Sequence, residues 1–98
     1  MTIQKDPEGT ETLHLAKIAD IAGHSVLEIG SGDGRLTWRY AHTARLVVGL
    51  DPDAEALITA HKDLPHDLRT TVSFTRASSL QLPFPDETFD RAILAWSF

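Results

Sequence analysis

The sequence predicts an α/β domain in which a parallel sheet is covered by helices on both faces. Three observations support this fold class. Short apolar runs recur along the chain, segments with helical spacing of apolar residues separate them, and the connections between the two kinds of segment are short. Connections of this kind join parallel strands, and they are right-handed in nearly all known cases.

The first expected elements are a helix and a strand. Residues 10–22 have apolar residues at helical spacing, and Gly23, a residue type that ends helices, follows them. The strand covers residues 25–29 and leads directly into a glycine-rich turn. A second helix follows this turn, and its apolar positions are Leu36, Tyr40, Ala41 and Ala44.

Three further strands and one helix complete the pattern. The second strand, residues 46–50, is apolar throughout, and Pro52 starts a helix that continues to about Lys62. The third strand, residues 71–75, alternates polar with apolar residues, which suits an edge strand with one wetter face. The fourth run, residues 91–96, is almost continuously apolar, as is typical of a parallel strand flanked on both sides.

The glycine-rich turn after the first strand predicts a nucleoside-cofactor site. Residues 28–34 have the pattern E-x-G-x-G-x-G. Glycine lacks a Cβ atom, so the backbone can adopt positive φ, and a ligand can lie directly against main-chain N–H groups at the start of a helix. A plain structural turn is the alternative explanation for such a motif taken alone.

The spacing of the glycines distinguishes between cofactors. The dinucleotide motif G-x-G-x-x-G needs its third glycine at a position that Arg35 holds here. Glu28, near the end of the strand, would repel a pyrophosphate and would suit a ligand that carries an ammonium group. A nicotinamide dinucleotide is therefore disfavoured.

Asp51 follows the second strand, about twenty residues after the glycine turn. At that place in an α/β fold, a carboxylate can accept hydrogen bonds from both hydroxyls of a ribose. An acid before Pro52 could also be a turn residue, and Asp53 is itself a suitable N-cap for the next helix. The position of Asp51 favours the ligand contact.

A third segment, residues 77–94, completes a family pattern. It contains Leu82-Pro83-Phe84-Pro85 and, before the fourth strand, Phe89-Asp90. With the glycine turn and Asp51, it resembles the class I S-adenosylmethionine-dependent methyltransferases, in particular their methyltransferase type 11 branch. The resemblance extends over residues 10–98 and covers the N-terminal, cofactor-binding half of such a domain. A rigid loop with one buried aromatic residue is the alternative explanation for the proline-containing stretch alone.

The resemblance implies a Rossmann-like three-layer sandwich with a mostly parallel sheet of strand order 3-2-1-4, truncated after strand four. It implies S-adenosylmethionine as the cofactor and methyl transfer to a small molecule as the activity. Glu28 and the main chain of Gly30 and Gly32 would hold the amino-acid part, and Asp51 would hold the ribose. The cofactor-binding residues that we expect are Glu28, Gly30, Ser31, Gly32, Gly34, Asp51, Pro52, Ser78, Ser79 and Leu80.

Ser78 departs from the family pattern, in which an acid usually receives the adenine. A serine hydroxyl can accept from the exocyclic amine but gives a weaker hydrogen bond than a carboxylate, and the N–H of Ser79 could also serve the ring. Trp96 and Ser97, after the fourth strand, are expected on the substrate side. No residue is expected to act as a catalytic base, which the family often does not need.

Composition limits the partners. With 42% hydrophobic and 23% charged residues, the chain suits a single domain, residues 1–98, in the cytoplasm. The formal net charge of -5 opposes a nucleic-acid partner. The sequence has no cysteine, and its histidines have no metal-ligand spacing, so no metal site is expected. No apolar run approaches the ~18 residues of a membrane span, and the start resembles no signal peptide, so no membrane contact is expected.

In the family that the chain resembles, further strands and helices follow the fourth strand and carry much of the substrate pocket. An uncovered strand edge invites pairing with another chain. Two expectations follow: the sequence is a fragment of a longer protein, or two copies form a homodimer through the strand-four edge. The alternative function is a non-catalytic cofactor-binding or assembly module that consists of half a methyltransferase domain.

Overall fold

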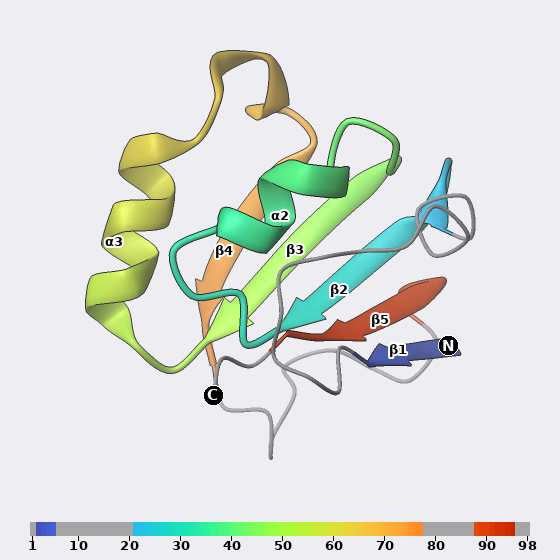
Figure 1. Cartoon of the computed structure of the whole chain (residues 1–98), viewed down its shortest axis with the longest axis horizontal. Helices are drawn as coiled ribbons and strands as arrows, with labels where there is room; N and C mark the ends of the chain where they lie inside the picture. Colours follow the sequence, from blue (N-terminus) through green and yellow to red (C-terminus); the bar gives the residue numbers. More distant parts are fainter. Residues whose placement is uncertain (1, 6–20, 78–87, 96–98) are drawn as a thin grey trace.

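The computed structural model describes residues 2–5, 21–77 and 88–95, and its strands form one five-stranded sheet. The strands are β1 (Thr2–Lys5), β2 (Ser25–Ile29), β3 (Leu46–Asp51), β4 (Val72–Arg76) and β5 (Arg91–Leu94). Their order across the sheet is β1-β5-β2-β3-β4, and all neighbouring pairs are parallel (Figure 1). The run β4-β3-β2-β5 confirms the predicted order 3-2-1-4.

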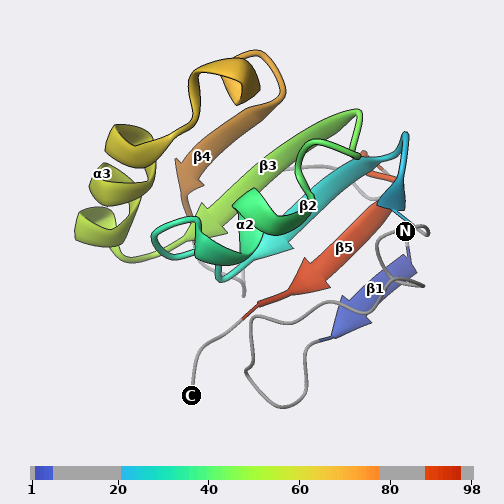
Figure 2. The ribbon, with the colours of Figure 1, turned by 45° about the horizontal axis from the view of Figure 1, so that its top comes forward.

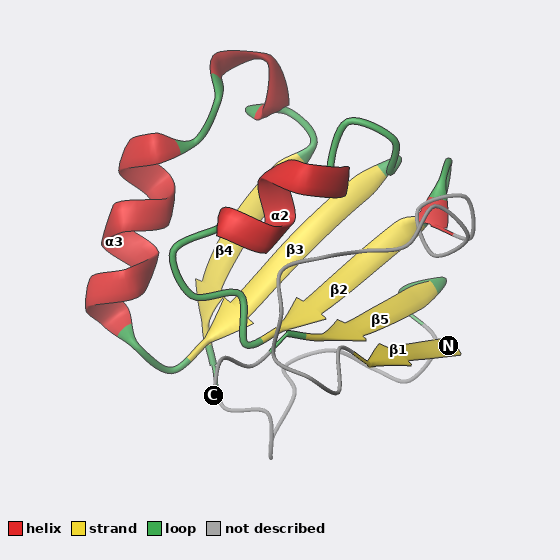
Figure 3. Ribbon diagram, in the orientation of Figure 1, coloured by secondary structure: helices red, strands yellow, loops and turns green. Residues whose placement is uncertain are grey.

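Two helices lie over one face of the sheet (Figure 3). They are α2 (Arg35–Tyr40) and α3 (Ala54–Asp63), and the short 3₁₀ helix η1 (His66–Leu68) precedes β4. The α3 helix begins two residues later than predicted because the side chain of Asp53 caps it, accepting hydrogen bonds from the N–H groups of Glu55 and Ala56. Of the helix predicted at 10–22, all but the last two residues lie outside the described part of the chain.

The main hydrophobic core lies between the sheet and these two helices. Its members include Val26, Leu36, Tyr40, Val47, Leu57, Ala60, Val72, Phe74 and Ile93. A smaller cluster on the other face of the sheet consists of Leu27, Ile29, Leu50, Phe89 and Ala92. All five residues of the central strand β2 are buried, whereas Ser73 and Thr75 of β4 are exposed. The prediction that the strand after α3, here β4, lies at an edge of the sheet is confirmed.

The strand β1 was not predicted from the sequence, and it lies beside β5 (Figure 2). Its four residues pair with the four residues of β5, from Thr2 opposite Arg91 to Lys5 opposite Leu94. The prediction that the edge of the fourth strand is uncovered is therefore wrong. The segment is short and mostly polar, so it has no apolar run, and backbone pairing with β5 makes it a strand. A homodimer at this side of the sheet stays a prediction.

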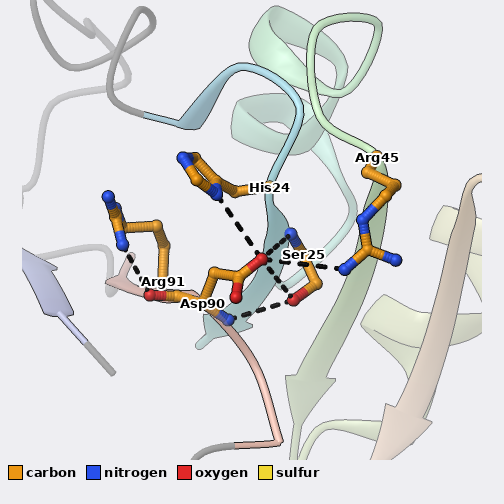
Figure 4. Close-up of polar contacts among 5 residues, drawn as sticks. All are labelled: His24, Ser25, Arg45, Asp90 and Arg91. Carbon is orange, nitrogen blue, oxygen red and sulfur yellow. Dashed lines mark hydrogen bonds and ion pairs between the residues drawn. The ribbon is translucent and has the colours of Figure 1, made fainter.

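Asp90 joins the beginnings of β2 and β5 (Figure 4). Its N–H donates to the carbonyl of Ser25 at 3.1 Å, and its Oδ2 accepts from the N–H of Ser25 at 3.0 Å. His24 Nδ1 and Arg45 Nη2 lie 3.5 and 3.7 Å from the same carboxylate oxygen. The hydrogen bond from the Ser25 backbone is the largest of the contacts that lower the pKa of Asp90. This network fixes the register of the two strands at the end of the sheet opposite to the glycine turn.

Candidate functional site

The glycine turn and Asp51 lie next to each other because β2 and β3 are parallel neighbours. Ile29, the last residue of β2, pairs with Leu50. The N–H groups of Gly30 and Ser31 both donate to the carbonyl of Leu50, at 2.8 and 3.1 Å. The turn therefore begins at the carboxyl edge of the sheet, which is where open α/β folds bind ligands.

Two of the glycines in the turn have different neighbours. A Cβ atom at Gly32, which has φ +57°, would meet no other atom within 4 Å. A Cβ atom at Gly34 would lie 2.5 Å from Cζ2 of Trp38. Gly32 thus borders open space, whereas Gly34 is needed for the packing of the Trp38 ring. The expectation that both glycines bind the cofactor stays a prediction.

The N–H groups of the turn are largely used within the protein. Gly32 donates to Oδ2 of Asp51 at 2.9 Å, and Gly34 donates to the carbonyl of Ser31 at 3.1 Å. With the two bonds of Gly30 and Ser31 to Leu50, four donors of the turn are satisfied. The end of β3 supplies acceptors for three of them. Contact of these N–H groups with a ligand stays a prediction.

The turn offers acceptors instead. Within the described residues, no donor bonds to the carbonyl oxygens of Gly30 or Gly32. Oxygen acceptors suit a ligand that carries ammonium or hydroxyl groups, and they repel phosphate oxygens, which need donors. The geometry of the turn therefore agrees with the exclusion of a pyrophosphate that the glycine spacing indicates.

Asp51 is half-buried and holds two neighbouring segments. Its Oδ2 accepts from Gly32, and its Oδ1 accepts from the N–H of Asp53 at 2.8 Å. An ionised carboxylate has about four acceptor positions, so each oxygen retains one for a further donor. Pro52 is exposed between Asp51 and the cap of α3, and its carbonyl accepts from Nε of Arg76 at 3.1 Å.

Glu28 is fully buried beneath α2. Its Oε1 accepts hydrogen bonds from the hydroxyl of Thr37 at 2.9 Å and from the hydroxyl of Tyr40. Burial raises the pKa of Glu28 to about 7, although these two hydrogen bonds act to lower it. Burial also raises the pKa of Tyr40, with the nearby Glu28 charge as a second cause.

The predicted contact of Glu28 with a ligand ammonium is not present in this arrangement, because the side chain has no exposed surface. Its Oε2 has no hydrogen-bond partner among the described residues. A ligand role for Glu28 stays a prediction that depends on this one oxygen. The structure shows the side chain linking β2 to α2.

Gly49 is a residue of the site region that sequence reasoning missed. It pairs with Glu28 on one side and with Phe74 on the other. A Cβ atom here would lie 2.7 Å from Cδ1 of Phe74 and 2.8 Å from Oγ of Ser31. The Ser31 side chain is thus buried over β3, and its hydroxyl has no partner in the described residues. A glycine inside an apolar strand was the available signal.

Several predicted site residues lie outside the described part of the chain. They are Ser78, Ser79, Leu80, Trp96 and Ser97. Their predicted contacts with adenine and substrate stay predictions. Within the described segments, no helix has the length and apolar character that crossing a membrane requires. Nor do three metal-ligating side chains there come close enough to hold an ion.

Comparison with known proteins decides the family. Residues 26–98 match the model of a methyltransferase domain family. The chain belongs to this family of methyltransferase domains. The resemblance to the class I S-adenosylmethionine-dependent methyltransferases is thereby confirmed, and so is the Rossmann-like fold.

Individual relatives agree with this membership of the methyltransferase family. The chain is 32% identical over 91 residues to an uncharacterized methyltransferase of Anoxybacillus flavithermus, covering 93% of this chain and 40% of the relative. It is 31% identical to the ubiquinone/menaquinone biosynthesis C-methyltransferase UbiE of Cellvibrio japonicus, covering 76% of this chain and 31% of the relative.

Solved structures show the same fold. The YcgJ protein of Bacillus subtilis matches with a TM-score of 0.69 and 28% identity, over 79% of this chain and 34% of that one. An S-adenosylmethionine-dependent methyltransferase of Methanosarcina mazei matches with a TM-score of 0.69 and 26% identity, over 84% of this chain and 42% of that one. The chain therefore spans well under half the length of these relatives.

Proposed function

We propose that this chain binds S-adenosylmethionine and forms the cofactor-binding part of a methyltransferase that acts on a small molecule. The observation that carries the proposal is the glycine turn. The carbonyl oxygens of Gly30 and Gly32 accept no bond from the described residues, the Asp51 carboxylate bonds to the same turn, and no atom lies within 4 Å of a Cβ position at Gly32. A ligand with an ammonium group, a sulfonium and a ribose matches these groups in charge and in hydrogen bonding.

Each part of the ligand has a proposed partner. The main-chain oxygens of Gly30 and Gly32 accept from its ammonium group, and the free acceptor positions of Asp51 receive the ribose hydroxyls. By resemblance to the family, Ser78, Ser79 and Leu80 meet the adenine. Trp96 and Ser97 are the proposed contacts on the acceptor side. Pro52 shapes the turn between Asp51 and the cap of α3.

The chemistry follows from placement. When bound, S-adenosylmethionine supplies an activated methyl group on its sulfonium. The protein holds this group in line with the acceptor atom, and such alignment of two reactants supplies much of the acceleration in bimolecular transfers. A positively charged ligand is also attracted by the overall field of a chain with a formal net charge of -5.

A small-molecule acceptor is supported by the relatives and by charge. One relative is named for ubiquinone and menaquinone biosynthesis, and the net charge of -5 opposes an RNA or DNA substrate. A solved structure of similar fold is named a [4+2]-cyclase, with a TM-score of 0.68 and 25% identity. Because one fold serves different reactions, methyl transfer needs its own assay.

Calorimetric titration tests the binding step. We expect the chain to bind S-adenosylhomocysteine and not the nicotinamide dinucleotide. Binding of the dinucleotide without binding of S-adenosylhomocysteine would overturn the proposal. Transfer of a labelled methyl group from S-adenosylmethionine to a quinone-type acceptor then tests catalysis, and binding without any transfer would favour the non-catalytic module.

A further inference from the structure

The Asp51 carboxylate accepts hydrogen bonds from two turns, the glycine turn after β2 and the turn before α3. One oxygen accepts from the Gly32 N–H of the glycine turn at 2.9 Å, and the other accepts from the Asp53 N–H before α3 at 2.8 Å. Asp51 itself ends β3. The side chain therefore ties the turn between β2 and α2 to the turn between β3 and α3.

The bond to Gly32 lies at the middle of the turn. Gly30 and Ser31 are held by the backbone of β3, and Gly34 is held by the carbonyl of Ser31 and by the ring of Trp38. Among the described contacts of Gly32, the Asp51 carboxylate is the one that holds its N–H. Hydrogen bonds to ionised acceptors are stronger than neutral ones, so this contact strongly restricts the peptide that precedes Gly32.

The peptide orientation at Gly32 also sets the directions of the neighbouring carbonyl groups. A peptide plane is rigid, so fixing the N–H of Gly32 fixes the carbonyl of Ser31, and the adjoining torsions aim the carbonyls of Gly30 and Gly32. Gly32 has φ +57°, and no neighbour lies within 4 Å of a Cβ position, so no atom packs against this residue from that side.

We propose that Asp51 is a positioning residue for the glycine turn as well as a ribose contact. This inference rests on the proposed function. Through its bond to the Gly32 N–H, the carboxylate orients the turn for the amino-acid part of the ligand. Through the acceptor positions that the protein leaves free, it receives the ribose hydroxyls. The two subsites are therefore coupled through one side chain, and a ligand without ribose hydroxyls still depends on Asp51.

A combined change of protein and ligand tests this coupling. S-Adenosylhomocysteine and its 2′,3′-dideoxy analogue are titrated into the unaltered chain and into Asp51→Ala. We expect Asp51→Ala to weaken binding of the dideoxy analogue by about 5- to 10-fold, although that ligand has no hydroxyl to lose. An effect of less than twofold on the analogue, with a large effect on S-adenosylhomocysteine, would limit Asp51 to the ribose contact and overturn the inference.

Asp53→Asn is the matched control. It removes a neighbouring negative charge but keeps an N-cap for α3, since the Asp53 side chain bonds, among the described residues, to the N–H groups of Glu55 and Ala56. We expect it to change binding of the analogue by less than twofold. An equal loss of analogue binding in Asp51→Ala and Asp53→Asn would show that removal of a negative charge explains the effect, and it would overturn the inference.

Amide hydrogen exchange supplies a readout without ligand. In Asp51→Ala, the Gly32 amide should exchange at least about tenfold faster, while the Gly30 amide, bonded to Leu50, should stay within about twofold. Asp51→Asn, which keeps one acceptor oxygen, serves if the alanine variant does not fold. Unchanged exchange at Gly32 overturns the inference. Failure of the unaltered chain to bind S-adenosylhomocysteine overturns the proposed function, and this inference with it.

Discussion

Glu28 shows how a side chain that belongs to a sequence motif can be buried and bonded within the protein. Side chains alternate along a strand, so Glu28 shares its face of β2 with Val26, and α2 covers both. Its partners Thr37 and Tyr40 lie on that helix. The alternation of side chains along β2 was therefore the sequence signal that Glu28 faces the core, as Val26 does. Its hydrogen bonds to the Thr37 and Tyr40 hydroxyls could be recognised only once α2 was packed on the sheet.

The raised pKa of Glu28 predicts a pH-dependent stability. The folded value is about 7 against 4.5 for an unperturbed glutamate, so the folded state retains a proton that the unfolded state loses between these values. The stabilising contribution is fully present below pH 4.5 and is lost as the pH rises through 7. We expect the free energy of unfolding to fall by about 3 kcal/mol over this range.

Glu28→Gln separates this effect from other titrations. Its amide oxygen can still accept from Thr37 and Tyr40, but the side chain does not titrate in this range. Urea unfolding of both proteins at several pH values gives the difference that belongs to Glu28. Parallel curves for the two proteins between pH 4.5 and 8 would contradict the assigned pKa.

Gly32 and Gly23 form a matched pair for testing the open space at the turn. Both have positive φ, +57° and +73°, and a Cβ atom at either would meet nothing within 4 Å. Only Gly32 adjoins the proposed ligand site. We expect Gly32→Ala to weaken binding of S-adenosylhomocysteine at least about tenfold, or about 1.4 kcal/mol.

Gly23→Ala carries the same kind of backbone strain at the other end of β2. Each variant should lose about 1 kcal/mol or more of stability. Calorimetry should find that Gly23→Ala binds the ligand as the unaltered chain does. Equal binding by both variants would place the ligand away from Gly32.

At the scale of elements, the bounds of a strand could be predicted from the sequence, but the pairing of β1 with β5 could not. The bounds of β2 were predicted correctly because an apolar run there ends at a glycine turn. The order of four strands was also correct, on the resemblance to the family. The strand β1 was missed because its four residues have no apolar run, and its formation depends on an edge that is distant in sequence. Long-range pairing of this kind leaves no local pattern.

The close approach of the glycine turn to β3 predicts a destabilising substitution. Gly49→Ala would place a Cβ atom 2.7 Å from Phe74 and 2.8 Å from Ser31, so β3 or the turn must shift. We expect a loss of about 1–3 kcal/mol in the free energy of unfolding, as for other overpacked sites. Urea denaturation measures it. A loss of less than about 0.5 kcal/mol would show that these neighbours give way freely.

At the scale of the whole molecule, the sheet has two different edges. The edge at β4 is formed by a strand with exposed Ser73 and Thr75, whereas the other edge is formed by β1. Between them, β5 has Ala92 and Ile93 buried, one on each face of the sheet. A strand that is buried on both faces and loses its neighbour presents unpaired backbone groups beside apolar surface. We therefore predict that β1 protects the chain from association through β5.

Replacing Thr2–Lys5 by alternating glycine and serine tests this protective role. The replacement keeps the chain length but lowers strand propensity. We expect the variant to self-associate, with an apparent mass by light scattering at least about twice that of the unaltered chain at equal concentration. The control is Ser73→Gly with Thr75→Gly, which weakens the β4 edge but leaves β5 covered, and its mass should not change. Equal masses for all three proteins would mean that the β5 edge does not need β1, because a bare edge of this kind would otherwise recruit a second copy.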